Sequence, residues 1–285
     1  MKLDAYSKHH PREVALAESA FLTAWAGLGA WHEDMVLVGG LVPKYLCGDT
    51  SASRDLPYPV TLDADIGIAL GASIGQYGAL KDHLAAQDFE MVHDKDEAAP
   101  RFARTIGAFR VYLDFLTEDP QATTGSVIVD TIPASVIPGI DRALAAPRIM
   151  EVQGVDLFGA NQILTIRVCE VGPFLALKLR AFGSRQQPKD AFDLLYTLRH
   201  YDGGTEAAIH AFAGEAKLNN PAMPDALRCL RMHFSTENAS APVRAAHFIC
   251  GQKTADEPAD IAFHRTRVQQ DVVDAAQMLI RALNP

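Results

Sequence analysis

Cysteine is scarce in this sequence, and its few copies lie far apart. The 285 residues include four cysteines with no Cys-x-x-Cys spacing among them (Cys47, Cys169, Cys229 and Cys250). Zinc sites built from cysteine usually use such closely spaced pairs. Widely separated cysteines are typical of proteins from a reducing compartment. The cysteines therefore argue against a zinc site and predict a cytoplasmic protein.

Long hydrophobic runs are missing as well. A transmembrane helix needs about 20 consecutive apolar residues, and no run of even about 18 occurs. The segment from Met1 to Ser7 contains Asp4 and no apolar core, so it does not have the pattern of a signal peptide. Hydrophobic residues make up 48% of the chain and charged residues 21%, which is typical of a soluble globular protein. The sequence predicts no interaction with a membrane.

Positive charge is in deficit. The chain has 26 lysines and arginines against 35 aspartates and glutamates, for a formal net charge of -9. Proteins that bind nucleic acid through many phosphates are usually basic, because neutralising the charge of those phosphates supplies the affinity. Extended DNA binding is therefore not expected. A local basic site can still hold a nucleotide or the end of an RNA.

The pattern of apolar residues changes near residue 170. Before it, strand patterns (35–38, 61–70, 89–93, 101–106, 109–116 and 163–168) are mixed with helical ones (11–30, 41–47 and 74–87). The stretch 128–156 is assigned only a short helix near 141–145. After Gly172 and Pro173 the patterns are helical. This organisation predicts an α+β protein with a core domain at 1–170 and an all-helical domain at 171–285.

Two aspartates interrupt an apolar strand. Asp63 and Asp65 lie in the segment from Thr61 to Leu70, and side chains two residues apart in a strand point to the same face. Aspartate is depleted in strands, and neighbouring carboxylates repel each other. A divalent cation would remove the conflict, since Mg²⁺ binds a few carboxylates and keeps positions open for phosphates. The alternative is a face that is simply solvated.

A Gly-Gly pair separates the strand at 35–38 from the helix at 41–47. Gly39 and Gly40 would let the backbone approach a phosphate closely, and the start of a helix favours an anion. A tight strand-to-helix turn is the alternative explanation.

A third carboxylate ends a second apolar strand. Asp114 lies in the strand predicted at 109–116 and shares a face with Arg110 and Tyr112. If that strand lies beside the first, Asp114 can complete a three-carboxylate cluster, and paired metal ions can then stabilise a phosphoryl displacement. An aspartate that caps a turn is the alternative.

Residues 171–200 form a basic island in an acidic protein. They contain five basic residues and two acids (Lys178, Arg180, Arg185, Lys189 and Arg199; Asp190 and Asp193). Lys178 and Arg185 are seven residues apart, so they share a helix face and can reach triphosphate oxygens. Asp193 can orient Lys178 or act as a base. A solvated helix face, with Lys189 paired to Asp193, is the alternative, and we prefer it for Arg180 and Arg199.

Taken in order, these motifs resemble a known family. Val38-Gly39-Gly40-Leu41, Thr61-Leu62-Asp63-Ala64-Asp65, Leu113-Asp114-Phe115-Leu116 and the stretch from Lys178 to Leu194 are similar to the nucleotidyltransferase-like toxins of the AbiEii/AbiGii type. Those toxins belong to the DNA polymerase β-like nucleotidyltransferase superfamily. The resemblance covers roughly residues 35 to 200, and it implies a mixed sheet flanked by helices, followed by a helical domain that completes the active site.

The resemblance also implies a reaction and roles for residues. The reaction is the transfer of a nucleoside monophosphate from an NTP to an acceptor hydroxyl, with Mg²⁺ or Mn²⁺ as cofactor and release of pyrophosphate. The roles are metal binding, nucleotide binding and support of catalysis (metal: Asp63, Asp65 and Asp114; nucleotide: Gly39, Gly40, Thr61, Lys178 and Arg185; catalysis: the three aspartates with Lys178 and Asp193). A basic residue often precedes the acidic pair in relatives, whereas this chain has Pro59-Val60-Thr61 there and keeps only the threonine.

The resemblance further suggests a toxin of a toxin–antitoxin or phage-defence system. Its acceptor would be a tRNA end or a protein, and a cognate antitoxin would be its partner. Two other functions stay open at this level. One is a nucleotidyltransferase that modifies a small molecule such as an antibiotic, and the other is a nucleotide-binding protein that keeps the fold without turnover.

Overall fold

The computed structural model describes residues 3–48, 56–71, 79–93 and 99–283. The chain is an α+β protein that divides into two compact units. The sheet unit comprises residues 10–42 and 60–170, and the helical unit comprises residues 1–9, 43–59 and 171–285. Residues 1–9 and 43–59, which the sequence analysis places in the first domain, thus cluster with the helices of the second.

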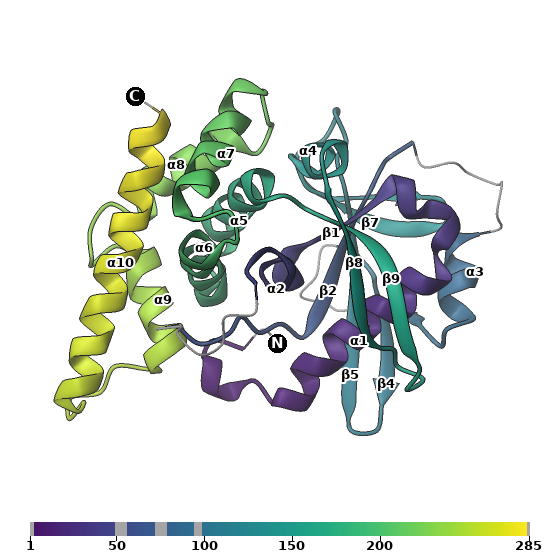
Figure 1. The fold of residues 1–285 in the computed structure, drawn as a ribbon, viewed down its shortest axis with the longest axis horizontal. Helices are drawn as coiled ribbons and strands as arrows, with labels where there is room; N and C mark the ends of the chain where they lie inside the picture. The colour runs from purple at the N-terminus through teal and green to yellow at the C-terminus, as the bar shows by residue number, and fades with distance from the viewer. Residues whose placement is uncertain (1–2, 49–55, 72–78, 94–98, 284–285) are drawn as a thin grey trace. The chain divides into compact units, whose positions relative to one another are not determined.

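The sheet unit is built on one mixed sheet, which Figure 1 shows in ribbon form. Within the described residues the main path of strands runs β3-β4-β5-β2-β1-β9-β8, and β7 joins β5 with β6 beside it. The strands span Met35–Val38 (β1), Asp63–Ile68 (β2), Glu90–Val92 (β3), Arg101–Ile106 (β4), Phe109–Thr117 (β5), Ser126–Val129 (β6), Ile132–Val136 (β7), Arg148–Val155 (β8) and Asn161–Val168 (β9). β2 runs parallel to β5 and antiparallel to β1, so β2 is a central strand.

Helix α1 (Pro11–Gly27) packs along the sheet, against β5 and β2 among other strands. It begins with proline in its first turn, where the missing N–H costs nothing, and the Nδ1 atom of His10 accepts a hydrogen bond from the Arg12 amide. At its other end the Trp25 indole donates to the Thr165 carbonyl at 3.0 Å. The remaining helical segments of this unit are short: η2 (Gly29–Asp34), η3 (Gly39–Leu41), α3 (Leu80–Ala85) and α4 (Ile140–Ala145).

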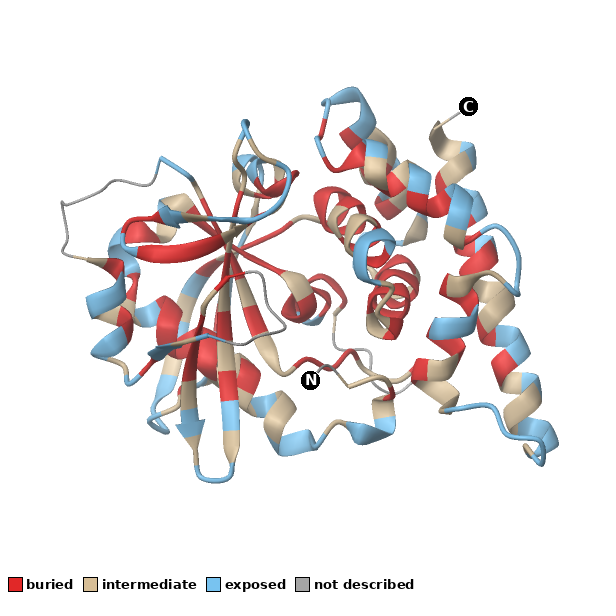
Figure 2. Ribbon diagram, turned by 180° about the vertical axis from the view of Figure 1, so that it is seen from behind, coloured by how far each residue is buried: buried red, intermediate tan, exposed pale blue. Residues whose placement is uncertain are grey.

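The helical unit contains the C-terminal part of the chain, from residue 171 onward. Its elements include η1 (Tyr6–Lys8), α5 (Val171–Arg185), α6 (Pro188–His200), α7 (Thr205–Lys217), α8 (Met223–His233), α9 (Ser240–Cys250) and α10 (Ala259–Leu283), and α2 (Val42–Leu46) leads into it from the sheet unit. α5 packs against α6, α7 and α8, while α9 packs against α6 and α10. Figure 2 shows α10 with one buried and one exposed face, the pattern of an amphipathic helix.

The structure confirms the coarse prediction of a mixed sheet flanked by helices and a helical C-terminal region. The stretch 128–156 contains more strand than the sequence analysis predicted. Besides α4 it includes part of β6 and all of β7 and β8. The helix expected at 74–87 is observed as α3, and residues 72–78 lie outside the described part. In the described ranges, every helix falls short of the length or apolar character that crossing a membrane requires.

Candidate functional site

Asp63 and Asp65 lie side by side on one face of β2. Their neighbours Ala64 and Ile66 point to the opposite face and are fully buried, whereas both aspartates are half-buried. This is the alternation that a strand imposes on successive side chains. Helix α1 packs on β2 and β5. The predicted same-face placement of the two aspartates is therefore observed.

Gly39 gives Asp65 the space it occupies. β1 pairs antiparallel with β2, so Val38 lies opposite Asp65, and Gly39 follows with a positive φ of 72°. A Cβ atom added to Gly39 would stand 2.7 Å from the Asp65 Cβ and closer still to its carboxyl group. Only glycine satisfies both the backbone angle and this close approach. Packing against Asp65 thus explains Gly39, and a phosphate contact by Gly39 or Gly40 stays a prediction.

Asp114 lies next to Asp65 on the neighbouring strand. The parallel register of β2 and β5 pairs Asp63 with Tyr112 and Asp65 with Asp114. Residues paired in this way share a face of the sheet. Three carboxylates therefore lie on one face of two adjacent strands, as the sequence analysis expected if the strands were neighbours.

An arginine that the sequence analysis did not single out connects these carboxylates. Arg101 begins β4, and its Nε and Nη2 atoms donate to the two carboxylate oxygens of Asp114, each at 2.6 Å. Nη2 also donates to an Asp63 oxygen at 3.2 Å. The guanidinium stacks over the Tyr112 ring, 4.4 Å from its centre, and its side chain is only 8% exposed. Arg101 is thus a fixed positive charge within the acidic face.

The surroundings of Asp114 oppose its ionisation. Burial and then the nearby charge of Asp65 raise the pKa of Asp114 to about 7, although the hydrogen bonds from Arg101 act in the other direction. Both Asp114 oxygens accept hydrogen bonds from Arg101, the geometry of an ionised carboxylate in a bidentate pair.

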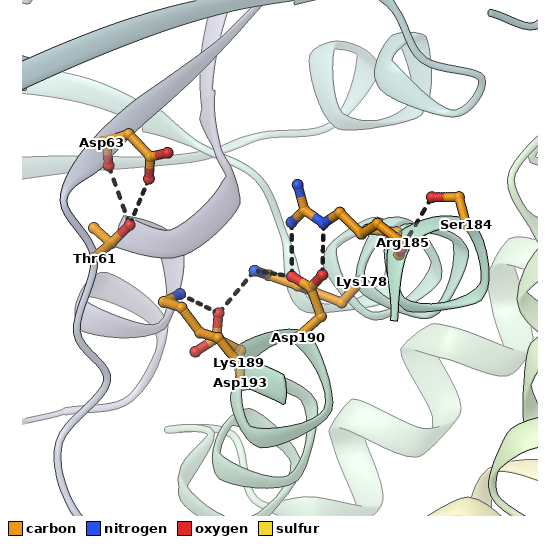
Figure 3. Close-up of polar contacts among 9 residues, drawn as sticks. Thr61, Asp63, Lys178, Ser184, Arg185, Lys189, Asp190 and Asp193 are labelled. Atoms are coloured by element: carbon orange, nitrogen blue, oxygen red, sulfur yellow. Dashed lines mark hydrogen bonds and ion pairs between the residues drawn. The ribbon is translucent and has the colours of Figure 1, made fainter. Parts of the chain in front are cut away.

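Thr61 supports Asp63 from the loop that leads into β2. Its hydroxyl donates to an Asp63 carboxylate oxygen at 2.8 Å, and Figure 3 shows the two side chains facing each other. The threonine predicted to bind nucleotide therefore orients a predicted metal ligand. One Asp63 oxygen accepts from Thr61 and the other from Arg101.

The acidic face has the donor chemistry of a magnesium site, because carboxylate oxygens are the ligands that Mg²⁺ prefers. A cation there would be held by Asp63 and Asp65, whose carboxylates are half-buried on one face of β2. In the described part of the chain, no three carboxylates, imidazoles or thiols are grouped in the manner of a metal site. Both Asp114 oxygens accept hydrogen bonds from Arg101.

A second cluster of charges lies inside the helical unit, between α5 and α6. Lys178 donates to Asp193 at 2.7 Å and to Asp190 at 3.3 Å. Arg185 donates to both oxygens of Asp190 at 2.7 and 2.8 Å, and Lys189 donates to Asp193 at 2.5 Å. Figure 3 shows the three cations surrounding the two carboxylates. The expected Lys178–Asp193 pair and the alternative Lys189–Asp193 pair thus occur together.

Most of this cluster is buried, and its ion pairs shift the pKa values of Asp190 and Lys178. Asp193 is fully buried, Asp190 is 2% exposed and Lys178 is 6% exposed. Burial acts to raise the pKa of Asp190, but Arg185 and Lys178 outweigh it and hold that pKa well below its usual range. Burial likewise acts to lower the pKa of Lys178, whereas Asp193 and Asp190 outweigh it and raise that pKa. Asp190 and Lys178 are therefore charged at neutral pH.

Asp190 is the member of this cluster to which sequence reasoning gave no role. It was counted only as an acid within the basic island, yet it binds both Arg185 and Lys178. Its position in the first turn of α6, directly after the end of α5, is the signal that would have indicated it. The solvated helix face preferred for Arg180 and Arg199 is wrong for Arg180, whose side chain is 11% exposed and lies 3.5 Å from Asp225. Arg199 is 30% exposed and lies 3.0 Å from Asp271.

Comparison of the chain with models of protein families and with curated proteins finds no match.

Proposed function

We propose that this protein is a Mg²⁺-dependent nucleotidyltransferase that transfers a nucleoside monophosphate from an NTP to an acceptor hydroxyl. The observation that carries the proposal is the row of carboxylates on the sheet: Asp63 and Asp65 share a face of β2, and Asp114 pairs in register with Asp65. An acidic row at the centre of a mixed sheet, beside a Gly-Gly turn, has the chemistry of a site for a metal-bound triphosphate. As part of the same proposal, we infer that the mixed sheet and its helices form a fold of the nucleotidyltransferase type.

Asp63 and Asp65 would hold the cation, with Thr61 fixing the orientation of Asp63 through a 2.8 Å hydrogen bond. When bound, the cation polarises the phosphoryl oxygens and neutralises charge that develops on the leaving pyrophosphate. In the reaction the acceptor oxygen forms a bond to the α-phosphorus, the bond from that phosphorus to pyrophosphate breaks, and the hydroxyl proton leaves. The sequence-based roles of Asp114 are to support the metal or to accept that proton.

The roles that the resemblance gives to Lys178, Arg185 and Asp193 also stay predictions. Within the helical unit these residues belong to a network of ion pairs, in which the buried Lys178 ammonium donates to Asp193 and Asp190. Cationic groups of this kind neutralise developing charge in phosphoryl transfer. The function as a toxin, the antitoxin partner and a tRNA or protein acceptor rest on the resemblance alone.

Pyrophosphate release from each of the four NTPs, with Mg²⁺ present, tests the proposal. RNA, protein and aminoglycoside acceptors are supplied separately with labelled nucleotide. We expect pyrophosphate release by the wild type, and a loss of about a hundredfold or more in Asp63→Asn and Asp65→Asn, because each removes a negative charge that would hold the cation.

Asp88→Asn is the matched control. Asp88 is an exposed aspartate of the sheet unit with a positive φ of 60°, which asparagine tolerates, and its ion pair with Arg104 is worth little on the surface. Its activity should equal that of the wild type. Label found only on the small molecule would exclude the toxin function, and NTP binding without any pyrophosphate release would exclude the enzyme.

A further inference from the structure

Strand β8 leaves one edge of the sheet open. It lies at the end of the strand path beside β9, and the described chain places no strand on its outer side. β8 spans eight residues (Arg148–Val155), whereas β3, at the other end of the path, spans three. Sheets usually protect an edge by keeping its strand short or by placing proline or lysine in it, and β8 contains neither residue. The strand is therefore suited to pair with a further strand.

The backbone groups of four residues of β8 point outward. In an antiparallel pair, residues that exchange hydrogen bonds with the partner alternate with residues whose N–H and C=O groups point away from it. The Asp156 amide donates to the Ala160 carbonyl at 3.0 Å, and this pair continues the register of β8 with β9. Counting back from Asp156, the even-numbered residues bond to β9. The outward groups belong to the odd-numbered residues (Ile149, Glu151, Gln153 and Val155), and no hydrogen bond from another described segment reaches them.

The side chains of the same four residues lie on the exposed face of β8. Helix α1 covers the other face, where Val152 is 8% exposed and a Cβ atom added to Gly154 would stand 2.5 Å from the Leu22 side chain. The four odd-numbered side chains are all exposed, Ile149 to 64% and Val155 to 48%. Two branched apolar side chains thus stand in solvent near the two ends of an open strand edge.

The order of these four side chains is self-complementary. They read isoleucine, glutamate, glutamine and valine along the strand. A second copy of β8, antiparallel about a two-fold axis at Val152, places Ile149 opposite Val155 of the second copy and Glu151 opposite its Gln153. Apolar branched pairs, and an amide that donates to a carboxylate, both stabilise opposed strands. An axis one residue earlier would set the two Glu151 carboxylates opposite each other, which is destabilising.

We propose that two copies of this chain associate through β8, antiparallel about a two-fold axis at Val152, so that their sheets join into one continuous sheet. The association goes beyond the proposed function and does not depend on it. In this register the outward N–H and C=O groups of each strand face those of the other, so they form a ladder of hydrogen bonds. A two-fold axis makes every contact occur twice, which is why a strand that complements itself selects a second copy as its partner.

Sedimentation equilibrium of the full chain measures the association. We expect a monomer–dimer equilibrium in the wild type. Ile149→Lys should raise the dissociation constant about tenfold or more, because it replaces an apolar pair by a charge twice across the axis. Ile128→Lys is the matched control, since Ile128 is a 70% exposed isoleucine of a different strand, β6, and its replacement should leave the constant unchanged.

Gln153→Pro tests the backbone ladder separately from the side chains. Proline at this position removes an N–H that points outward and bonds to no other described segment, and an edge strand tolerates such a proline. The variant should keep its circular dichroism and still dimerise about tenfold more weakly or worse, because the hydrogen bond is lost on both sides of the axis. It carries the test if Ile149→Lys does not fold.

Cysteine pairs test the register. Cys250→Ser provides the background, because Cys47, Cys169 and Cys229 are buried. Ile149→Cys and Val155→Cys are prepared as separate proteins and oxidised either alone or mixed. Opposed residues of a hydrogen-bonded antiparallel pair have Cα atoms about 5.5 Å apart, which is within the range of a disulfide. We expect a disulfide-linked dimer in the mixture and none from either protein alone.

Three results would overturn the inference. The first is a wild type that stays monomeric up to about 0.1 mM, an affinity too weak for a specific dimer. The second is a dimer that Ile128→Lys disrupts and Ile149→Lys leaves intact. The third is a mixture without the disulfide, or a disulfide formed by either cysteine variant alone. The release of pyrophosphate is measured independently, so these results leave the proposed function standing.

Discussion

Replacing Asp190 with asparagine is expected to destabilise the helical unit strongly. Asp190 is 2% exposed and accepts three hydrogen bonds, two from Arg185 and one from Lys178. Removing one partner of a buried ion pair costs about 3–5 kcal/mol, because the other charge stays buried without compensation. The Arg185 side chain is 43% exposed and can regain water, and Lys178 keeps Asp193. We therefore expect a loss near the lower end, about 3 kcal/mol.

Urea unfolding measures this loss, with two signals that separate the units. Circular dichroism at the helical wavelength follows mainly the helices α5 to α10. Fluorescence follows the sheet unit, because the two tryptophans of the sequence, Trp25 and Trp31, both lie there. The dichroism midpoint of Asp190→Asn should fall with little change of slope. A loss below about 1 kcal/mol would refute the argument, since it would mean that the cluster is not a buried, mutually dependent set of charges.

Asp274→Asn is the control for this experiment. Asp274 is an exposed aspartate of α10 whose side chain accepts a hydrogen bond from Gln270. Surface substitutions of this kind usually change the free energy of unfolding by less than about 0.5 kcal/mol.

Two further predictions concern pH and the Gly-Gly turn. Because the pKa of Asp190 is lowered in the folded state, its charged form contributes stability above the unfolded pKa of about 4, and that contribution disappears as the pH falls through the folded pKa. The stability difference between wild type and Asp190→Asn should thus be constant from about pH 5 to about pH 8 and shrink in stronger acid, as urea unfolding at a series of pH values will show. Gly39→Ala should cost the sheet unit about 1–3 kcal/mol in tryptophan-monitored unfolding and should weaken Mn²⁺ binding, because a side chain at φ 72° is strained and displaces Asp65. Gly29→Ala, where an added Cβ meets nothing within 4 Å, should leave both unchanged.

Much of the acidic face could be predicted because it depends on local rules. The alternation of a strand puts Asp63 and Asp65 on one face whatever the rest of the chain does. Arg101 could also have been found, because β4 and β5 are joined by a two-residue turn and Ile106 pairs with Phe109. Counting back along both strands from that turn places Arg101 opposite Asp114.

Other features could not be predicted in this way. The strands β6, β7 and β8 lack the usual alternation of buried apolar and exposed polar residues, since β6 and β8 expose apolar side chains such as Ile128 and Ile149, and β7 contains Pro133, a residue that argues against a strand. The pairing of β2 with β5, which brings Asp114 beside Asp65, joins strands that are separated by forty residues of the sequence, from 69 to 108. Nothing in either segment specifies that pairing.

The sequence by itself therefore determined the side-chain chemistry and the face on which each group lies within its own strand or helix. It placed Asp63 with Asp65 and separated a mixed α/β part from a helical part, because periodicity is a local property of the backbone. Only the tertiary structure decided which strands are neighbours and which charges meet. The tertiary structure sets the pairing of Arg101 with Asp114, and it also sets the pairing of Asp190 with Arg185 and Lys178. A buried charge needs a partner at hydrogen-bond distance, and only the folded chain brings that partner close enough.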